Sequence, residues 1–393
     1  MSKKSPLIKI GDTCKVFSGG TPRRGIEGYY GGDIPWAKIG DIETAEDGYL
    51  FTTKESITQE GLKSINNKIF KKDTIFLALY GSVGKTAIAG REMSTNQAIL
   101  GLIPKNPEVL YFKYLKYWLD YSKSELIGLA RGVALQNISA TIVKEYPIPL
   151  QTIEEQNRIV KILDRAQSLI EKRKQAISCL DDYIKAVFLD MFGDPVSNPK
   201  GWEVGKIGDL VSEINYGTSA KAGSIGKFPY LRMNNITYNG EFNLIDLKYI
   251  DLAESDINKY TVSKGDLLFN RTNSKELVGK TAVVNFGTSM AFAGYLIRVR
   301  TNKKAIPEYI SGYLNSKHGK ATLMHMCKSI VGMANINAKE LQKIRILIPS
   351  VETQEHYKKI YDDMLSLKQK MQTQLKELED NFQAQLRRAF RGE

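Results

Sequence analysis

The sequence predicts an α/β protein made of two similar modules, each followed by one long helix. Two observations carry this prediction. Short strings recur in the same order at a nearly constant spacing along the 393 residues, and two long tracts contain neither glycine nor proline. Chains of this length normally form two or three domains. An internal repeat of this kind decides the fold before any single element does.

The repeat is visible in five pairs of strings. Lys-Ile-Gly-Asp at residues 9–12 returns at residues 206–209, an offset of 197. Gly-Thr at 20–21 returns at 217–218 with the same offset. Three further pairs, 34–38 with 228–232, 85–87 with 280–282 and 154–156 with 352–354, have offsets of 194, 195 and 198. Small loop insertions produce such a drift, so we infer a tandem duplication in which each copy is about half of the chain.

The composition changes once within each copy. Residues 1–151 and 192–349 are rich in glycine, aromatic residues and β-branched runs. The runs at 74–79 and 344–348 are typical of strands, and the stretch 111–121 is typical of a helix. This mixture predicts an α/β globular module in each copy.

The second part of each copy predicts a long helix. Residues 152–191 and 350–391 contain no glycine or proline, and Thr152 with Glu155 forms a capping box. Ser350 is placed to begin the second helix in the same way. Apolar residues then follow alternating steps of three and four, a spacing that drives long helices to pair. At about 1.5 Å per residue each helix would be roughly 60 Å long. Each could instead lie along its own module, but the two similar lengths favour pairing.

The charge indicates an anionic partner. The formal net charge is +13, and nucleic acid is the commonest partner of such a chain. A membrane surface is the competing anion, but the sequence has neither a lysine-rich amphipathic helix nor a lipidation motif. Residues 152–191 carry seven basic and seven acidic side chains, and residues 350–391 carry eight and seven. The basic excess therefore lies in the modules, and DNA is expected to bind there.

Cysteine and histidine usage argues against a metal site. Cys14, Cys179 and Cys327 are far apart and indicate free thiols in a reducing compartment. The chain has three histidines, none of them in a cluster, so no zinc site and no cofactor are expected. No signal core or membrane span is apparent, which predicts a cytoplasmic protein.

At this point a family resemblance becomes visible over essentially the whole chain. It is carried by the string Gly-Gly-Thr-Pro at 19–22 with Tyr-Gly-Gly-Asp-Ile-Pro-Trp at 30–36, and by Gly-Ser-Val-Gly-Lys at 81–85. Gln-Asn-Ile-Ser at 136–139 leads to Pro-Ile-Pro-Leu at 147–150, and the junction at 191–195 leads to Gly-Trp-Glu at 201–203. In this order, with the duplication and two long helices, the chain resembles the specificity subunit of Type I restriction–modification enzymes.

The resemblance implies a fold of two tandem α/β target-recognition domains joined by two long helices that pair as an antiparallel coiled coil, with pseudo-twofold symmetry. The domains would be residues 1–151 and 192–349, and the spacer helices 152–191 and 350–393. It also implies that each domain reads one half of a bipartite, asymmetric target in double-stranded DNA. Two adenine methyltransferase subunits would dock on the chain, and motor–nuclease subunits would join for cleavage. A rigid spacer would set the separation of the half-sites.

Motifs for catalysis by this chain are missing from the sequence. A phosphate-binding loop at Gly84-Lys85 needs a glycine at position 79, which is leucine, and Gly279 needs one at position 274, which is serine. A strand–turn–strand that brings Lys85 and Lys280 near phosphate fits better, and a plain tight turn fits the glycines equally well. Neither Asn106-Pro107 nor Asp194-Pro195 is followed by the second proline of an adenine methyltransferase motif. Base flipping therefore belongs to a partner. An enzyme with an unrecognised site and an assembly scaffold that does not read DNA remain the alternatives.

The candidate DNA contacts are polar and basic side chains in or beside predicted loops. Arginine pairs with guanine, and asparagine or glutamine with adenine, in the major groove. Each residue taken singly could be a solvated surface group or a turn former, and the cations could contact phosphate alone. In the first module the candidates are Arg23, Arg24, Lys38, Tyr80, Ser82, Lys85 and Gln136. In the second they are Arg232, Asn234, Asn235, Arg271, Asn273, Lys280 and Asn335.

Three further expectations concern packing and the differences between copies. Trp36 and Trp202 are expected to be core or domain-packing residues rather than to stack on bases. The near-repeat of residues 191–193 at 390–392 predicts that the end of the second helix lies near the first module. The string Asn-Arg-Thr-Asn at 270–273 replaces Leu-Ala-Leu-Tyr at 77–80, which suggests that the two copies read different bases.

Overall fold

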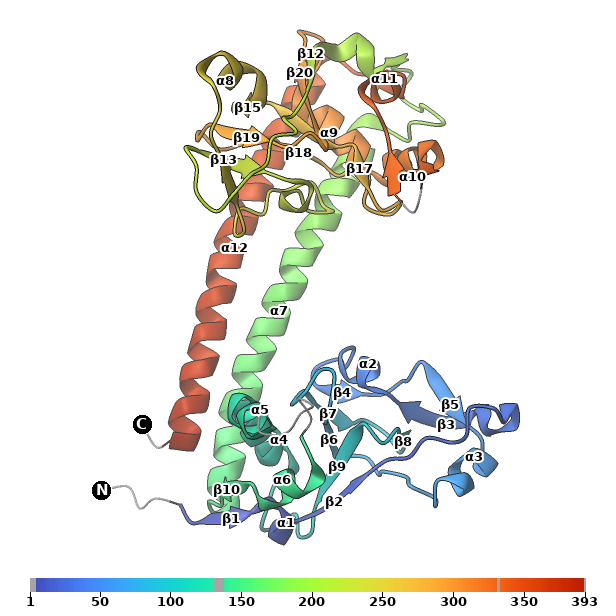
Figure 1. Cartoon of the computed structure of the whole chain (residues 1–393), viewed down its shortest axis with the longest axis vertical. Coiled ribbons are helices and arrows are strands. Elements are labelled where there is room, and N and C mark those ends of the chain that lie inside the picture. Colours follow the sequence, from blue (N-terminus) through green and yellow to red (C-terminus); the bar gives the residue numbers. More distant parts are fainter. Residues whose placement is uncertain (1–4, 131–137, 331–332, 392–393) are drawn as a thin grey trace. The chain divides into compact units, whose positions relative to one another are not determined.

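A computed structural model describes residues 5–130, 138–330 and 333–391 of the chain (Figure 1). These residues form two compact units. The first consists of residues 1–174 with 373–393, and the second of residues 175–372. Each unit therefore combines one α/β module with a portion of both long helices.

The described part of the first unit contains three small sheets. A five-stranded sheet has the order β2-β9-β6-β7-β4, a three-stranded sheet has the order β5-β3-β8, and β1 pairs with β10. The strands are β1 (Leu7–Lys9), β2 (Cys14–Ser18), β3 (Tyr30–Ala37), β4 (Tyr49–Leu50), β5 (Glu55–Ile57), β6 (Ile75–Ala78), β7 (Thr86–Ala89), β8 (Ser94–Thr95), β9 (Ile99–Pro104) and β10 (Pro147–Pro149). The helices are α1 (Ile10–Thr13), η1 (Glu27–Tyr29), α2 (Ile39–Ile42), α3 (Gln59–Ser64), α4 (Phe112–Tyr121), α5 (Lys123–Ala130) and α6 (Ala140–Glu145).

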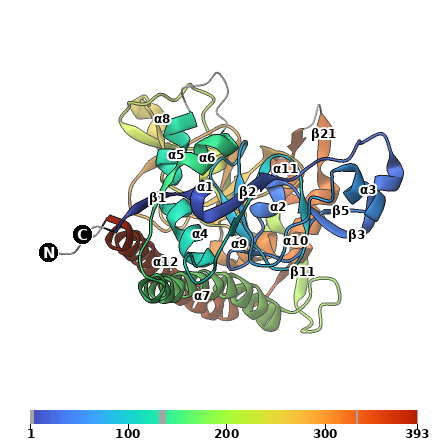
Figure 2. The same cartoon turned by 90° about the horizontal axis from the view of Figure 1, so that it is seen from below.

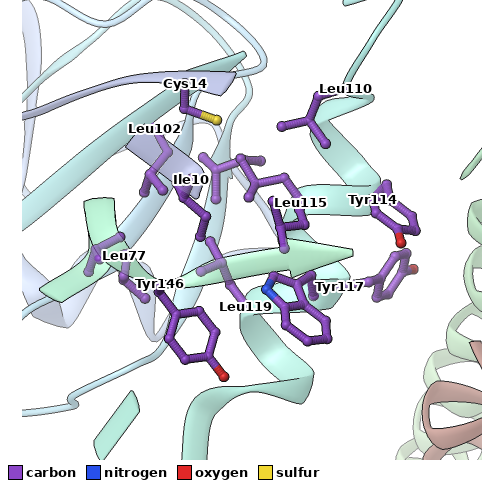
Figure 3. Packing of buried hydrophobic residues seen from close by; sticks show 14 of the residues in the cluster. Ile10, Cys14, Leu77, Leu102, Leu110, Tyr114, Leu115, Tyr117, Leu119 and Tyr146 are labelled. Atoms are coloured by element: carbon purple, nitrogen blue, oxygen red, sulfur yellow. The ribbon is translucent and has the colours of Figure 1, made fainter. Parts of the chain in front are cut away.

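The main core of the first unit lies between its five-stranded sheet and helix α4. Residues Leu77 and Leu102 of the sheet are buried against Leu115 and Leu119 of α4 (Figure 3). On its other side α4 packs against the first part of the long helix that follows β10 (Figure 2). A helix with two apolar sides of this kind is held as an internal layer, which fixes the sheet relative to that part of the long helix.

The second unit repeats this plan with local changes. A four-stranded sheet β12-β20-β16-β18 corresponds to β2-β9-β6-β7, a sheet β14-β13-β19-β15 corresponds to β5-β3-β8, and β11 pairs with β23 as β1 does with β10. A three-stranded sheet β17-β22-β21 is specific to this unit among the described residues. The strands are β11 (Glu203–Lys206), β12 (Val211–Tyr216), β13 (Phe228–Leu231), β14 (Lys248–Ile250), β15 (Thr261–Val262), β16 (Leu267–Asn270), β17 (Thr272–Asn273), β18 (Thr281–Val283), β19 (Met290–Phe292), β20 (Leu296–Thr301), β21 (Lys328–Ile330), β22 (Met333–Asn335) and β23 (Arg345–Ile348). The shorter helices are η2 (Ile207–Leu210), η3 (Met233–Asn235), α8 (Glu254–Tyr260), α9 (Pro307–Asn315), α10 (Lys317–Met326) and α11 (Ala338–Gln342).

Two long helices complete the fold, as the sequence predicted. Helix α7 (Ile153–Phe192) begins in the first unit and ends in the second, whereas α12 (Val351–Arg391) begins in the second and ends in the first. They therefore run antiparallel. The hydroxyls of Thr152 and Ser350 accept hydrogen bonds from the backbone N–H groups three residues later, both at 3.3 Å, which caps each helix.

The long helices contact both each other and the modules. In the first unit Lys174 of α7 pairs with Glu379 of α12 at 3.4 Å. In the second unit Phe188 of α7 packs on Tyr357 of α12 with ring centroids 5.4 Å apart. Residues of both helices also belong to the apolar cores of the modules. The sequence left open whether the long helices pair with each other or lie along their modules. In the structure they do both.

One glutamine in each unit anchors a long helix to its module in the same way. Gln156 Oε1 accepts from Tyr111 N at 2.8 Å, and its Nε2 donates to the carbonyls of Val109 and Gln151 at 2.8 and 2.9 Å. Gln354 makes the corresponding three bonds, to Ile306 N at 3.0 Å and to the carbonyls of Lys304 and Pro349 at 3.0 and 2.9 Å. Both side chains are fully buried. The repeat of Glu-x-Gln in the sequence therefore marks a structural anchor.

The remaining packing expectations are also met. Phe390, near the end of α12, lies 5.2 Å from the ring of Trp118 in the first module, as the repeat of residues 191–193 predicted. Phe192, at the end of α7, lies 4.7 Å from Tyr309 in the second unit. Trp36 is 1% exposed, and Trp202 is half-buried with its indole N–H donating to the carbonyl of Phe192 at 3.0 Å. Both tryptophans therefore serve packing.

Candidate nucleic-acid interface

In each unit most candidate contacts gather around one short helical turn and one hairpin. The turn is α2 in the first unit and η3 in the second, and each directly follows a strand of the smaller sheet, β3 or β13. The hairpin joins β6 to β7 in the first unit and β16 to β18 in the second, and its strands are antiparallel. This confirms the strand–turn–strand interpretation of the two Gly-Lys strings.

The hairpins have the same backbone geometry. Gly84 and Gly279 have φ of +76° and +77°, a region that favours glycine. Gly84 N donates to Ala78 O at 3.0 Å, and Gly279 N donates to Asn270 O at 2.8 Å. Because these bonds are equivalent, Asn270 corresponds to Ala78 and Arg271 to Leu79. The replaced string is therefore 78–81, one residue later than the sequence alignment gave.

The first unit holds two of its candidate cations with one carboxylate. Arg24 Nη1 donates to Glu55 at 2.8 Å, and Lys38 forms an ion pair with the same carboxylate. The hydrogen bond from Lys38 lowers the pKa of Glu55, although partial burial opposes this shift. The Arg24 guanidinium also lies 4.7 Å from the ring of Tyr30 and 5.1 Å from that of Trp36. Stacking and pairing together fix its position.

A second group lies on the other side of α2. Ser82 donates a hydrogen bond to Glu43, and Lys85 Nζ donates to the same carboxylate at 2.9 Å. These bonds lower the pKa of Glu43. Lys38 precedes α2 and Glu43 follows it, so the short helix links both groups. The basic surface of the first unit therefore also carries two carboxylates, which could accept hydrogen bonds from cytosine amino groups.

The other candidates of the first unit are less closely grouped. Arg23 is exposed beside Arg24, and Tyr80 is half-buried against the core at the start of the hairpin turn. Gln136 lies outside the described residues.

In the second unit, the turn η3 uses some of the candidates for its own structure. Asn235 is 2% exposed; its Oδ1 accepts from Arg232 N at 2.9 Å, and its Nδ2 donates to Asn243 O at 2.9 Å. Lys280 is 7% exposed and donates to the carbonyls of Met233 and Ile236. Burial lowers the pKa of Lys280. Both polar groups are thus bonded inside the fold, and we leave Asn235 and Lys280 out of the interface.

Two candidates on this turn keep contact with solvent. Asn234 is exposed, and Arg232 is partly exposed with its Nη2 donating to Asp246 Oδ2 at 2.9 Å. Arg232 thus repeats the cation–carboxylate arrangement that Lys38 makes at the corresponding position in the first unit.

Of the last three candidates, Arg271 lies between β16 and β17, Asn273 lies on β17, and Asn335 lies on β22. Thr272 of β17 is paired with Asn335 of β22, which places Arg271, Asn273 and Asn335 beside one another. Arg271 is partly exposed, and its guanidinium lies 5.0 Å from the ring of Tyr216. Sequence reasoning missed Tyr216, Glu43 and Glu55 in these groups. It also missed Tyr295, whose carbonyl accepts from Arg271 N at 3.0 Å. Tyr216 directly precedes the repeated Gly217-Thr218 string, and that position could have pointed to it.

Each unit thus places a stacked arginine and solvent-facing polar side chains around its turn and hairpin, although Arg24 and Arg271 lie on different elements. Comparison with known proteins now decides the family. A model described as the Type I restriction modification DNA specificity domain matches residues 3–178 and again residues 199–380. The chain belongs to this family. It is a DNA specificity subunit, itself non-catalytic, of a Type I restriction–modification system, as the sequence indicated.

Individual relatives agree with this assignment. The specificity subunit of the Type I restriction enzyme MjaIX from Methanocaldococcus jannaschii is 27% identical over 297 residues, covering 71% of this chain and 68% of that protein. The EcoKI specificity subunit from Escherichia coli K12 is 24% identical over 387 residues, covering 92% and 82% of the two chains.

Solved structures show the same fold. The Type I S subunit from M. genitalium superposes with a TM-score of 0.55 at 16% identity and covers 99% of this chain and 96% of its own. A chain from a structural study of Type I complex assembly gives a TM-score of 0.60 at 17% identity, with 99% of both chains covered. The predicted mixed α/β fold with two modules and paired long helices is therefore confirmed. In the described part of this specificity subunit, no helix has both the length and the apolar character needed to cross a membrane.

Proposed function

We propose that the two units read the two halves of a bipartite, asymmetric target in double-stranded DNA. Residues 1–151 act as the first target-recognition domain and residues 192–349 as the second, and the helices 152–191 and 350–393 set the unread spacing between the halves. The observation that carries this proposal is the repetition of one interface plan, a short helical turn beside a hairpin, with different side chains in each unit. A repeated scaffold with different contacts suits a target whose halves differ.

The contacts we assign to DNA are the solvent-facing candidates of each unit. In the first unit Arg24, Lys38 and Lys85 can reach phosphate or base edges once they leave their carboxylates, because these ion pairs lie at the surface and are weak. In the second unit Arg271 and Asn234 take this role. The remaining solvent-facing candidates support them as phosphate contacts or as neighbours of the reading residues: Arg23, Tyr80, Ser82, Arg232, Asn273 and Asn335.

The chain is further proposed to recruit catalytic partners, since it performs no chemistry itself. Helix α7 carries large apolar side chains that are exposed, among them Ile162 at 41% and Leu169 at 49% in the first unit. Their spacing of seven residues places them on one face of the helix. Exposed apolar stripes of this kind are typical of protein interfaces. We assign this face to adenine methyltransferase subunits, with motor–nuclease subunits joining the same cytoplasmic complex.

Methylation mapping tests the proposal. The chain is co-expressed with its methyltransferase partner, and modified adenines in the host DNA are located by sequencing. We expect one bipartite asymmetric motif that disappears when this chain is omitted. The double variant Arg24→Ala with Lys38→Ala should alter one half of that motif only, whereas Lys144→Ala, an exposed cation on α6, should leave it unchanged. Methylation that is independent of this chain would favour the scaffold alternative.

A further inference from the structure

We propose that Arg271, held on the ring of Tyr216, selects a guanine in the half of the target that the second unit reads. This inference rests on the proposed function. It names guanine as the base that Arg271 reads and Tyr216 as the side chain that positions Arg271. The first unit has no equivalent pair. Backbone hydrogen bonds match Arg271 with Leu79, and strand registers match Tyr216 with Ser18.

The backbone of Arg271 is fixed on both sides. Its N–H donates to Tyr295 O at 3.0 Å, and its carbonyl accepts from Ile336 N at 2.9 Å. Leu79 makes the same two bonds in the first unit, to Ala98 O and from Ile138 N. A shared scaffold position therefore carries a buried leucine in one unit and an arginine in the other. This difference cannot be attributed to a change of fold.

The side chain of Arg271 is held by an aromatic ring rather than by a carboxylate. Its guanidinium carbon lies 5.0 Å from the ring centroid of Tyr216, whose hydroxyl accepts a hydrogen bond from Ala338 N at 2.9 Å. Within the described residues Arg271 forms no ion pair, in contrast to Arg24, Lys38, Lys85 and Arg232. The arginine is thus pre-positioned without competition from an acidic group, and its fork of donors is available for a ligand.

Unpaired polar atoms gather beside this arginine. Both amide atoms of Asn270, the hydroxyl of Thr272, Oδ1 of Asn335 and Nε of Arg271 are buried without a hydrogen-bond partner in the described structure. Folded proteins leave few such atoms unpaired, and each needs an explanation. Asn270 is fully buried, and its counterpart Ala78 has no polar side-chain atom at all. The unpaired groups lie along one strip. Asn270 and Thr272 are too deeply buried for a ligand to reach, so a polar ligand can complete the hydrogen bonding only at the partly exposed Arg271 and Asn335.

The exposed neighbours match the chemistry of a base edge. Tyr216 is 41% exposed and Tyr295, whose carbonyl holds Arg271, is 54% exposed. Guanine offers O6 and N7 as two acceptors on its major-groove edge, and an arginine fork binds both at once. Lysine has no such fork, so charge alone cannot replace the arginine. Guanine is therefore the base that this arrangement favours.

The test uses the complete specificity subunit co-expressed with its methyltransferase partner, and compares the methylated motifs of variants by sequencing. We expect the half read by the second unit to contain a G·C pair at which Arg271→Lys and Arg271→Ala both relax the sequence requirement. Loss of one bidentate contact corresponds to roughly 5- to 150-fold in discrimination at that position. The first half of the motif should stay unchanged in both variants.

Two variants of Tyr216 and one control variant separate positioning from folding. Tyr216→Ala removes the ring and should relax the same base pair as Arg271→Lys, whereas Tyr216→Phe keeps the ring and should largely retain the wild-type motif. Lys303→Ala, which removes an exposed cation elsewhere in the second unit, should change nothing. Thermal unfolding of each purified variant checks that the fold is retained.

The outcomes distinguish this inference from the proposed function. If a bipartite motif depends on the chain but no position relaxes in Arg271→Lys or Arg271→Ala, the guanine assignment is wrong while the two-unit reading stands. If Arg271→Lys relaxes a position and Tyr216→Ala does not, the positioning role of Tyr216 is wrong. If no bipartite motif depends on the chain, the proposed function itself fails.

Discussion

The two units agree where the modules hold the long helices and differ where each hairpin meets solvent. Gln156 and Gln354 form the same three hydrogen bonds to backbone groups. At the hairpin, in contrast, the buried Ala78 and Leu79 of the first unit become Asn270 and Arg271 in the second. The two modules thus keep the residues that complete backbone hydrogen bonding and change side chains of the hairpin, where we propose that DNA is contacted. This is the pattern expected of a scaffold that supports two different binding specificities.

The largest expected effect comes from breaking the shared anchor. Gln156→Leu or Gln354→Leu removes the side-chain partner of one backbone N–H and two carbonyls. At about 1–3 kcal/mol for each group that is left unpaired, we expect each substitution to destabilise its own unit by roughly 3–9 kcal/mol when all three stay unpaired. Hydrogen exchange resolved by unit is the appropriate measurement, because a chain with two units need not unfold in one step.

A surface glutamine on the same helix provides the matched control. Among the residues that the structure describes, Gln167 bonds only to Glu171 one turn away, so Gln167→Leu should change stability by less than about 0.5 kcal/mol. Equal losses of protection in the two units after Gln156→Leu and Gln354→Leu would support the equivalence of the anchors. A clear loss in one unit with none in the other would refute it.

The next largest effect on stability concerns two ionic contacts that involve α7 and α12. One is a buried lysine bound to two carboxylates, and the other is an exposed ion pair. In the second unit Lys368 of α12 is 5% exposed and bonds to Asp181 of α7 and to Glu241. Lys368→Ala leaves two carboxylates without their cation and should cost about 3–5 kcal/mol. In the first unit Lys174 and Glu379 both have side chains 48% exposed, so Lys174→Ala should cost less than about 1 kcal/mol. Denaturant unfolding with hydrogen exchange measures both losses.

The pH dependence gives a second readout of Lys368. Burial alone would lower its pKa, but the bonds to Asp181 and Glu241 outweigh this and raise it above 10.5. A pKa that is raised on folding contributes stability below the unfolded value and loses it as the pH rises through the folded value. The wild-type protein should therefore lose stability above pH 10.5 more steeply than Lys368→Ala. Parallel pH profiles for the two proteins would contradict a stabilising role of the charged lysine.

The sequence was sufficient to predict the fold because the fold depends on signals that lie close together in the chain. The two helices were visible as tracts without glycine or proline, and their caps at Thr152 and Ser350 lie at the predicted ends. The repeat located both modules and the near-symmetric position of Phe390. These features need no knowledge of which segments meet in space.

The interface was harder to predict because its groups come from distant segments. Lys280 looked like a phosphate contact, yet its ammonium reaches the carbonyls of residues 233 and 236. Glu55 neutralises Arg24 from a separate strand, at a separation of 31 residues. The hairpin alignment was one residue off because sequence similarity there is low, and only the backbone bonds of Gly84 and Gly279 corrected it. Residue type alone cannot distinguish a lysine that folds inward from one that faces solvent.

The smallest expected effect tests whether the unpaired polar groups beside Arg271 lower the stability of the second unit. Asn270→Leu keeps approximately the size and shape of the side chain and removes a fully buried amide whose two polar atoms have no partner. Replacing an unpaired buried polar group by an apolar one of similar shape is stabilising when no partner is left behind. We expect thermal unfolding of the second unit to shift upward by an amount that corresponds to about 1–2 kcal/mol. A lower unfolding temperature would mean that the Asn270 amide is hydrogen-bonded in the free protein. Unpaired polar groups would then no longer distinguish the second hairpin from the first.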